Sequence, residues 1–86
     1  MQAIDTEMDL SMSKNLKDII AGAYKYKKTI PDRADYIKAR MNELYSNIKW
    51  SVFIYDFGSS RPSYTKPYFF YCEMNNQCII VFGYIH

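Results

Sequence analysis

The chain has 86 residues and a formal net charge of +2, from eleven basic and nine acidic side chains. This length makes one domain, and the charge is too balanced to require a nucleic acid or a membrane surface as partner. No apolar run approaches the ~18 residues of a membrane-spanning helix, so we expect no membrane insertion. The two cysteines cannot form a dense disulfide framework, and no signal-peptide pattern is present, which favours a reducing, cytoplasmic compartment.

The first ten residues show a weak alternation over residues 4–10, which predicts a short edge strand. The acidic residues Asp5, Glu7 and Asp9 resemble the start of an EF-hand loop. However, Leu10 stands where that loop needs Gly, and Leu16 where it needs a bidentate Glu. We therefore expect no metal ion in this segment.

Residues 12–28 are predicted to form a helix that Ser11 or Ser13 caps. Gly22 is a poor helix former, and we interpret it as a close approach of another backbone. One face of this helix is predicted to be apolar, with residues at helical spacing: Leu16, Ile19, Ile20, Ala23 and Tyr24.

A second helix is predicted to follow, ending near residues 45–47. Thr29 is a good N-cap, Pro31 fits the first turn, and Asp32 and Asp35 suit the positive end of the helix dipole. Its predicted apolar stripe consists of Ala34, Ile37, Met41 and Leu44.

Lys25, Lys27 and Lys28 cluster at the end of the first helix, beside two tyrosines. This mixture has two interpretations: cations that complement the helix dipole, or a nucleic-acid surface. Because no recognition motif accompanies the cluster, we favour the first and expect no nucleic acid as partner.

Three apolar and aromatic runs, residues 50–55, 68–72 and 78–82, have the composition of strands. The pair Asn75-Asn76 predicts a turn between the last two. The order strand, helix, helix, strands predicts an α+β domain in which two helices pack on an antiparallel sheet.

Residues that catalysis needs are scarce in this sequence. The single histidine is His86, so neither a His-based triad nor a multi-His metal site can be built. Asp56-Phe57-Gly58 matches a kinase tripeptide, but the glycine-rich loop and the other kinase elements are missing. We expect no enzyme and no cofactor. Cys72 and Cys78 are predicted to face each other across a hairpin as buried thiols, with a labile disulfide as the alternative.

The polar segment of residues 57–64 is predicted to be an exposed strand. Ser59, Ser60 and Ser63 are small and would let another backbone approach closely, whereas Arg61 and Pro62 blunt the edge. Such a strand can pair with a second copy of the chain or accept an extended peptide. A plain surface loop is the third interpretation.

Several short motifs, in order and with one-residue shifts only, carry a family resemblance over roughly residues 3–84. They are Ala3-Ile4, Asp9-Leu10-Ser11, Asp32 with Ile37-Lys38 and Tyr45, Trp50 at the start of a strand, Phe57-Gly58-Ser59, Thr65-Lys66 and Ile79-Ile80-Val81-Phe82. In these motifs the chain resembles the small dynein light chains of the eight-kilodalton class.

The resemblance implies two helices and a short strand with a four-stranded antiparallel sheet, in a cytoplasmic, cytoskeleton-associated homodimer. It implies that the strand of residues 57–64 crosses to the partner's sheet. Each interface groove would then bind an extended segment of a disordered client such as dynein intermediate chain. The implied groove residues are Phe57, Gly58, Ser59, Ser60, Arg61, Pro62 and Ser63 of the crossing strand, the floor residues Phe70, Cys72, Cys78 and Ile80, and Ile30, Pro31 and Asp32 at the helix end. The implied dimer interface comprises Ser51, Phe57, Ser59, Ser60, Arg61, Pro62 and Tyr64.

The chain departs from the family at five of these positions. Ile30-Pro31 replaces a Glu-Lys pair that receives a client glutamine, and Pro31 offers no N–H, so client preference is expected to change. Cys72 replaces a groove tyrosine and would widen the pocket, and Pro62 replaces a Thr and removes one ladder donor. Ser51 replaces an interface histidine, so we expect no dimer dissociation between about pH 5 and 7.

A second resemblance is to the tegumental proteins of parasitic flatworms, in which an EF-hand pair precedes a dynein-light-chain-like C-terminal domain. The changed groove and the acidic residues 5–9 fit this alternative. The chain would then be a dimerising, structural domain of a longer calcium-binding protein.

Overall fold

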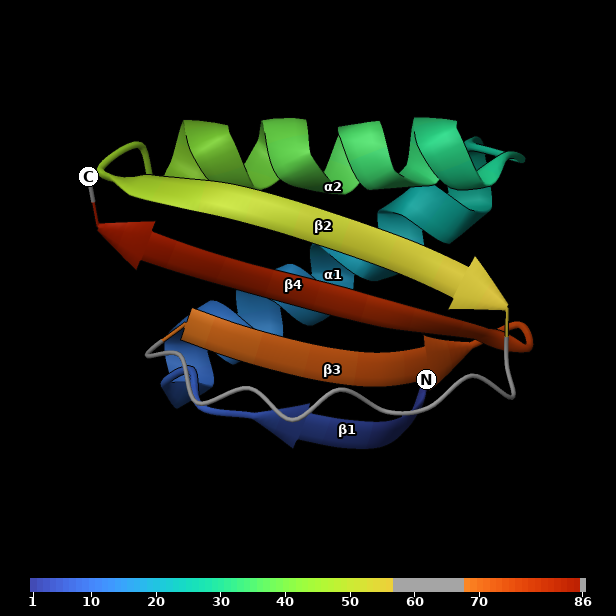
Figure 1. Ribbon diagram of the computed structural model, residues 1–86, viewed down its shortest axis with the longest axis horizontal. Helices are drawn as coiled ribbons and strands as arrows, with labels where there is room; N and C mark the ends of the chain where they lie inside the picture. Colours follow the sequence, from blue (N-terminus) through green and yellow to red (C-terminus); the bar gives the residue numbers. More distant parts are fainter. Residues whose placement is uncertain (57–67, 86) are drawn as a thin grey trace.

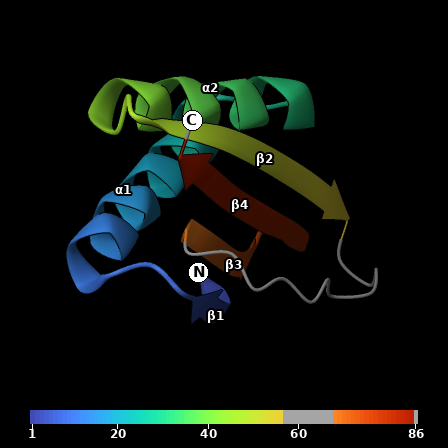
Figure 2. The same ribbon diagram turned by 60° about the vertical axis from the view of Figure 1, so that its left-hand side comes forward.

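The computed structural model describes residues 1–56 and 68–85 as two helices on one face of a four-stranded antiparallel sheet (Figures 1 and 2). This confirms the predicted α+β class. The strand order in the sheet is β1-β3-β4-β2. The elements in chain order are β1 (Gln2–Thr6), α1 (Leu10–Tyr26), α2 (Ile30–Leu44), β2 (Ile48–Asp56), β3 (Tyr68–Met74) and β4 (Gln77–Ile85). Of the described helices, none is both long and apolar enough to cross a membrane.

Helix α1 begins earlier than predicted because Asp9 caps it. The Asp9 carboxylate accepts a hydrogen bond of 2.8 Å from the backbone N–H of Met12, which satisfies one donor of the first turn. The predicted caps, Ser11 and Ser13, are therefore wrong, and Ser13 is itself buried. All five residues predicted for the apolar face are buried, as expected.

Helix α2 begins as predicted. The Thr29 hydroxyl accepts from the N–H of Asp32 at 3.3 Å, and Pro31 occupies the first turn. Ile37 and Met41 are completely buried, whereas Leu44 is 54% exposed, so the predicted stripe is wrong at its last position. The helix ends there, and Tyr45 packs against the core instead.

Gly22 lies where the two helices pack together. A Cβ atom at Gly22 would stand 3.0 Å from the hydroxyl oxygen of Tyr36. The prediction of a close backbone approach is therefore wrong, because the nearest atoms belong to a side chain of α2.

The β3–β4 hairpin turns at Asn75 and Asn76, as predicted, with Met74 paired to Gln77. Both asparagines have positive φ, 52° and 61°, which is the backbone of the two-residue turns that suit twisted strands. The turn is tied to both helices because the Gln77 side-chain oxygen accepts from the Tyr24 hydroxyl at 2.6 Å and from Arg33 at 3.1 Å.

The main core lies between the sheet and the helices. Trp50 is 1% exposed at its centre, and the rings of Tyr45 and Tyr68 each lie 6.1 Å from its ring. The largest completely buried side chains around it are Leu16, Ile20, Ile37, Met41, Phe70, Ile79 and Val81.

Candidate functional site

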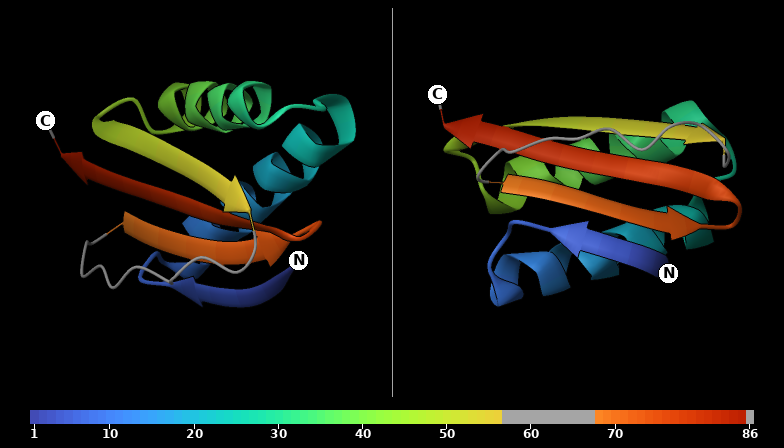
Figure 3. Two further views of the ribbon diagram at one scale, coloured as in Figure 1. Left: turned by 45° about the vertical axis from the view of Figure 1, so that its right-hand side comes forward. Right: turned by 60° about the horizontal axis from the view of Figure 1, so that its bottom comes forward.

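The sheet face away from the helices, here called the aromatic face, is apolar as well. Both helices lie on the other face (Figure 3). An antiparallel sheet with one free face usually alternates apolar and polar residues, but successive residues of β4 are buried here on both faces. The buried residues of the aromatic face are Phe69, Tyr71, Cys78 and Ile80, with Tyr55 and Phe82 packed against them. A sheet apolar on both sides is typical of a domain with a further layer.

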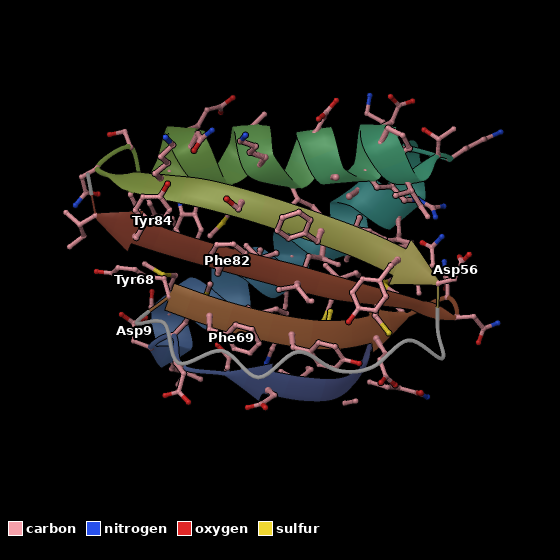
Figure 4. All side chains as sticks on the ribbon, in the orientation of Figure 1. Asp9, Asp56, Tyr68, Phe69, Phe82 and Tyr84 are labelled. Carbon is pink, nitrogen blue, oxygen red and sulfur yellow. The ribbon has the colours of Figure 1, made fainter. Side chains whose placement is uncertain are left out.

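Three aromatic side chains extend this face toward the β2 edge and the end of β4. Phe53 is 54% exposed, and its ring stacks on that of Phe82 with centroids 5.9 Å apart and planes at 23°. Tyr84 is 44% exposed and follows Phe82 on the same side of β4. Figure 4 looks onto this face, with Phe82 and Tyr84 along β4 and Phe69 on β3. An exposed aromatic cluster beside a buried apolar one is typical of an interface.

Tyr71 brings a polar group into the aromatic face. Its hydroxyl donates to a carboxylate oxygen of Glu73 at 2.8 Å and lies 3.5 Å from the sulfur of Cys78. Burial, followed by the contacts with Cys78 and Glu73, raises the pKa of Tyr71 well above its usual value. Tyr71 therefore stays a neutral hydrogen-bond donor at physiological pH.

The two edges of the described sheet differ. In β1 the pairing register shifts between Gln2 and Asp5, and Ala3 has a positive φ of 52°. Such a bulge discourages further pairing at that edge. At the other edge β2 runs regularly for nine residues, and among the described strands it pairs with β4 alone. The β2 edge is the better candidate for pairing with another chain.

The four residues implied for a groove floor do not share a surface. Phe70 and Cys72 belong to the core beneath the helices, whereas Cys78 and Ile80 belong to the aromatic face. The register pairs Cys72 with Ile79, so residues of the same parity on β3 and β4 point to opposite sides.

The remaining implied site residues fall into three groups. Pro31 and Asp32 are exposed and Ile30 is half-buried at the start of α2, where Thr29 already holds the N–H of Asp32. Ser51 is half-buried and pairs with Phe82, at the aromatic face. The others lie outside the described residues: Phe57, Gly58, Ser59, Ser60, Arg61, Pro62, Ser63 and Tyr64.

Cys72 and Cys78 are both buried free thiols, which confirms that part of the prediction. They do not face each other, however, because they lie on opposite sides of the sheet. An intramolecular disulfide needs the two Cβ atoms to point toward each other, so the predicted juxtaposition across the hairpin is wrong.

Burial raises the pKa of the Cys72 thiol to about 12, from an ordinary value of 9.0. The neutral thiol is therefore retained in the folded state, and its stabilisation is present below about pH 9 and lost as the pH rises toward 12. We expect the free energy of unfolding to fall by about 1 kcal/mol from pH 7 to pH 10, because the unfolded thiol ionises first. Urea titrations at both pH values measure this decline. In Cys72→Ala most of it should disappear, and an equal decline there would contradict the assignment.

Within residues 1–56 and 68–85, no three His, Cys, Asp or Glu side chains gather where they could hold a metal ion. No protein-family model matches the sequence. A search of curated proteins found no significant match. The sequence analysis missed Phe53 as a site residue. The signal that could have found it is the unbroken apolar run of residues 78–82, which is typical of a strand covered on both faces and in which Ile80 pairs with Phe53.

Proposed function

We propose that this chain is a non-enzymatic, dimeric protein-binding hub that holds short extended segments of client proteins by β-augmentation. Two copies pack through their aromatic faces, and the clients add a strand beside the paired sheets. The resemblance to small dynein light chains supports this function, with dynein intermediate chain-like segments and other disordered proteins as clients and a cytoplasmic, cytoskeleton-associated setting.

The observation that carries the proposal is the aromatic face. Phe53 and Tyr84 leave half or nearly half of their surface in solvent directly beside buried Phe69, Tyr71 and Ile80. Removing the exposed half of such an aromatic side chain from water contributes on the order of 1 kcal/mol, so covering Phe53 and Tyr84 with a second copy favours association. In a symmetric dimer each such residue contributes twice.

The β2 edge supports the binding of clients. Edge strands offer unpaired N–H and C=O groups, and a client segment gains its affinity from main-chain hydrogen bonds to such groups. Because the β2 edges of both chains would be linked in one dimer, a client with two binding segments gains avidity without new contacts.

A second candidate is a dimerising domain of a tegumental calcium-binding protein that binds no client. The start of α2 favours it. Thr29 already satisfies the N–H of Asp32, and Pro31 has none to offer. In the resembled family this helix end receives the client glutamine, so a structural role without clients also fits the chain.

A peptide selection distinguishes the two candidates. We expect a displayed library of random peptides of about twelve residues to yield binders with micromolar affinity, at one peptide per chain and two per dimer. We also expect a peptide with the glutamine motif of the resembled family to bind at least about tenfold more weakly than the selected peptides, since the donor that glutamine needs is missing.

Isothermal titration measures both values, with sedimentation in the same buffer as the control for dimerisation. A dimer that enriches no peptide would favour the structural domain, and a monomer that binds no peptide would exclude both candidates.

A further inference from the structure

An open pocket lies between α2 and the start of β2, at the β2 edge of the sheet. Its volume is about 300 Å³. The helix side contributes Lys38 and Asn42, one turn apart on α2, and the turn that follows contributes Ser46. The strand side consists of Ile48, Lys49 and Trp50. Three successive residues of β2 line it, so the pocket runs along the β2 edge, where α2 lies beside the strand (Figure 1).

The pocket is cationic and has an apolar floor. Two of its described lining residues are lysines and none is acidic. Neither lysine forms an ion pair with a carboxylate of the described residues. The ion pair among those residues joins Arg40 to Glu43 at 4.0 Å, outside the pocket. The side chains of Asn42 and Ser46 add neutral hydrogen-bonding groups, while Ile48 and Trp50 are buried beneath them.

This combination suits one kind of ligand group. A lysine from the helix side and a lysine from the strand give the pocket a positive charge that complements a carboxylate, and the apolar floor accepts the methylene groups that carry it. A small metabolite would contact the pocket but not the adjoining edge of β2. An extended chain can pair with that edge through main-chain hydrogen bonds and place an acidic side chain in the pocket.

We infer that the Lys38–Lys49 pocket selects client segments that carry Asp or Glu. This inference rests on the proposed hub function and assigns its client class. Selectivity would then reside near the C-terminal half of α2, far along the helix from Thr29 and Pro31. A glutamine-centred motif would be replaced by an acidic one.

Trp50 provides a direct readout, because it is the single tryptophan of the chain and lines the pocket. The probes are two synthetic peptides, STEVETES and its uncharged counterpart STQVQTQS. We expect the acidic peptide to shift the Trp50 indole N–H resonance and its fluorescence, with an affinity at least about tenfold above that of the uncharged one. Its affinity should fall as salt is added, because exposed charge pairs are screened.

Charge-removing variants locate the effect. Lys38→Gln and Lys49→Gln should each weaken binding of STEVETES by about fivefold. Arg40→Gln removes the same charge from the same helix outside the pocket and should leave the affinity within about twofold. Thermal unfolding of each variant verifies that it is folded.

Each remaining outcome overturns the inference. Equal binding of both peptides would show client binding without acidic selectivity, and the hub function would stand. Absence of binding by either peptide, while library peptides bind, would also leave the hub intact and reject the acidic class. Free glutarate binding as tightly as STEVETES would assign the pocket to small anions instead of polypeptide segments.

Discussion

Replacing Gly83 with alanine is expected to lower the melting temperature by about 10–20 °C. A Cβ atom at Gly83 would stand 2.6 Å from the Cγ2 of Ile48 and 2.8 Å from the ring of Trp50, closer than real Cβ atoms approach. Both neighbours are buried, so neither can move without displacing the core. Overpacking of this kind costs about 1–3 kcal/mol, and each kcal/mol shifts the melting temperature of a domain this small by about 4–8 °C.

Gly22→Ala is the matched control for this prediction. Its Cβ would meet the hydroxyl of Tyr36 at 3.0 Å, and that hydroxyl is the far end of a long side chain. The gain in helix propensity, about 1 kcal/mol, offsets the adjustment that Tyr36 must make. We expect a stability within about 1 kcal/mol of wild type. If Gly83→Ala proved as stable as Gly22→Ala in thermal unfolding, the packing of β4 against Trp50 would have to be revised.

Phe53→Lys is expected to raise the dimer dissociation constant at least about a hundredfold. The substitution removes an aromatic ring from the aromatic face and places a charge beside Phe82, and symmetry applies the loss twice. The fold of the single chain should survive, because Phe53 is already 54% exposed. Sedimentation equilibrium over a range of concentrations measures the constant, and circular dichroism verifies the fold.

Leu44→Lys controls for the loss of any exposed apolar residue. Leu44 is also 54% exposed, but it ends α2 on the opposite side of the sheet. We expect its dissociation constant to stay within about threefold of wild type, since it lies outside the proposed interface. A Phe53→Lys protein that dimerises like Leu44→Lys would move the interface away from the aromatic face.

The parts of the fold that local chemistry decides could be predicted from the sequence. The apolar residues of α1 repeat at helical spacing, Thr29 is followed by a proline in the first turn, and Asn75-Asn76 suits a turn with positive φ. Each signal lies within a few residues, so no distant contact is needed to interpret it.

The start of α1 shows where such local signals become ambiguous. Asp9, Ser11 and Ser13 can all cap a helix, and the sequence offers no means of ranking them. The structure selects Asp9, which leaves Ser13 free to be buried against the core.

The face that each strand residue presents could not be predicted. The run of residues 78–82 is apolar throughout, so the sequence does not show which of its side chains point to which face of the sheet. The sequence pattern therefore predicts Cys72 and Cys78 side by side, although the register puts them on opposite sides of the sheet. The exposure of Phe53 depends on what packs against β2, which composition does not reveal.

Sedimentation velocity of the wild-type chain tests most directly whether two copies associate, as the proposed covering of the aromatic face requires. We expect a single species with the mass of two chains at micromolar concentration, at about pH 5.5 as well as at about pH 7.5, because Ser51 provides no titrating group there. A species with the mass of one chain at both pH values and at all concentrations would contradict it.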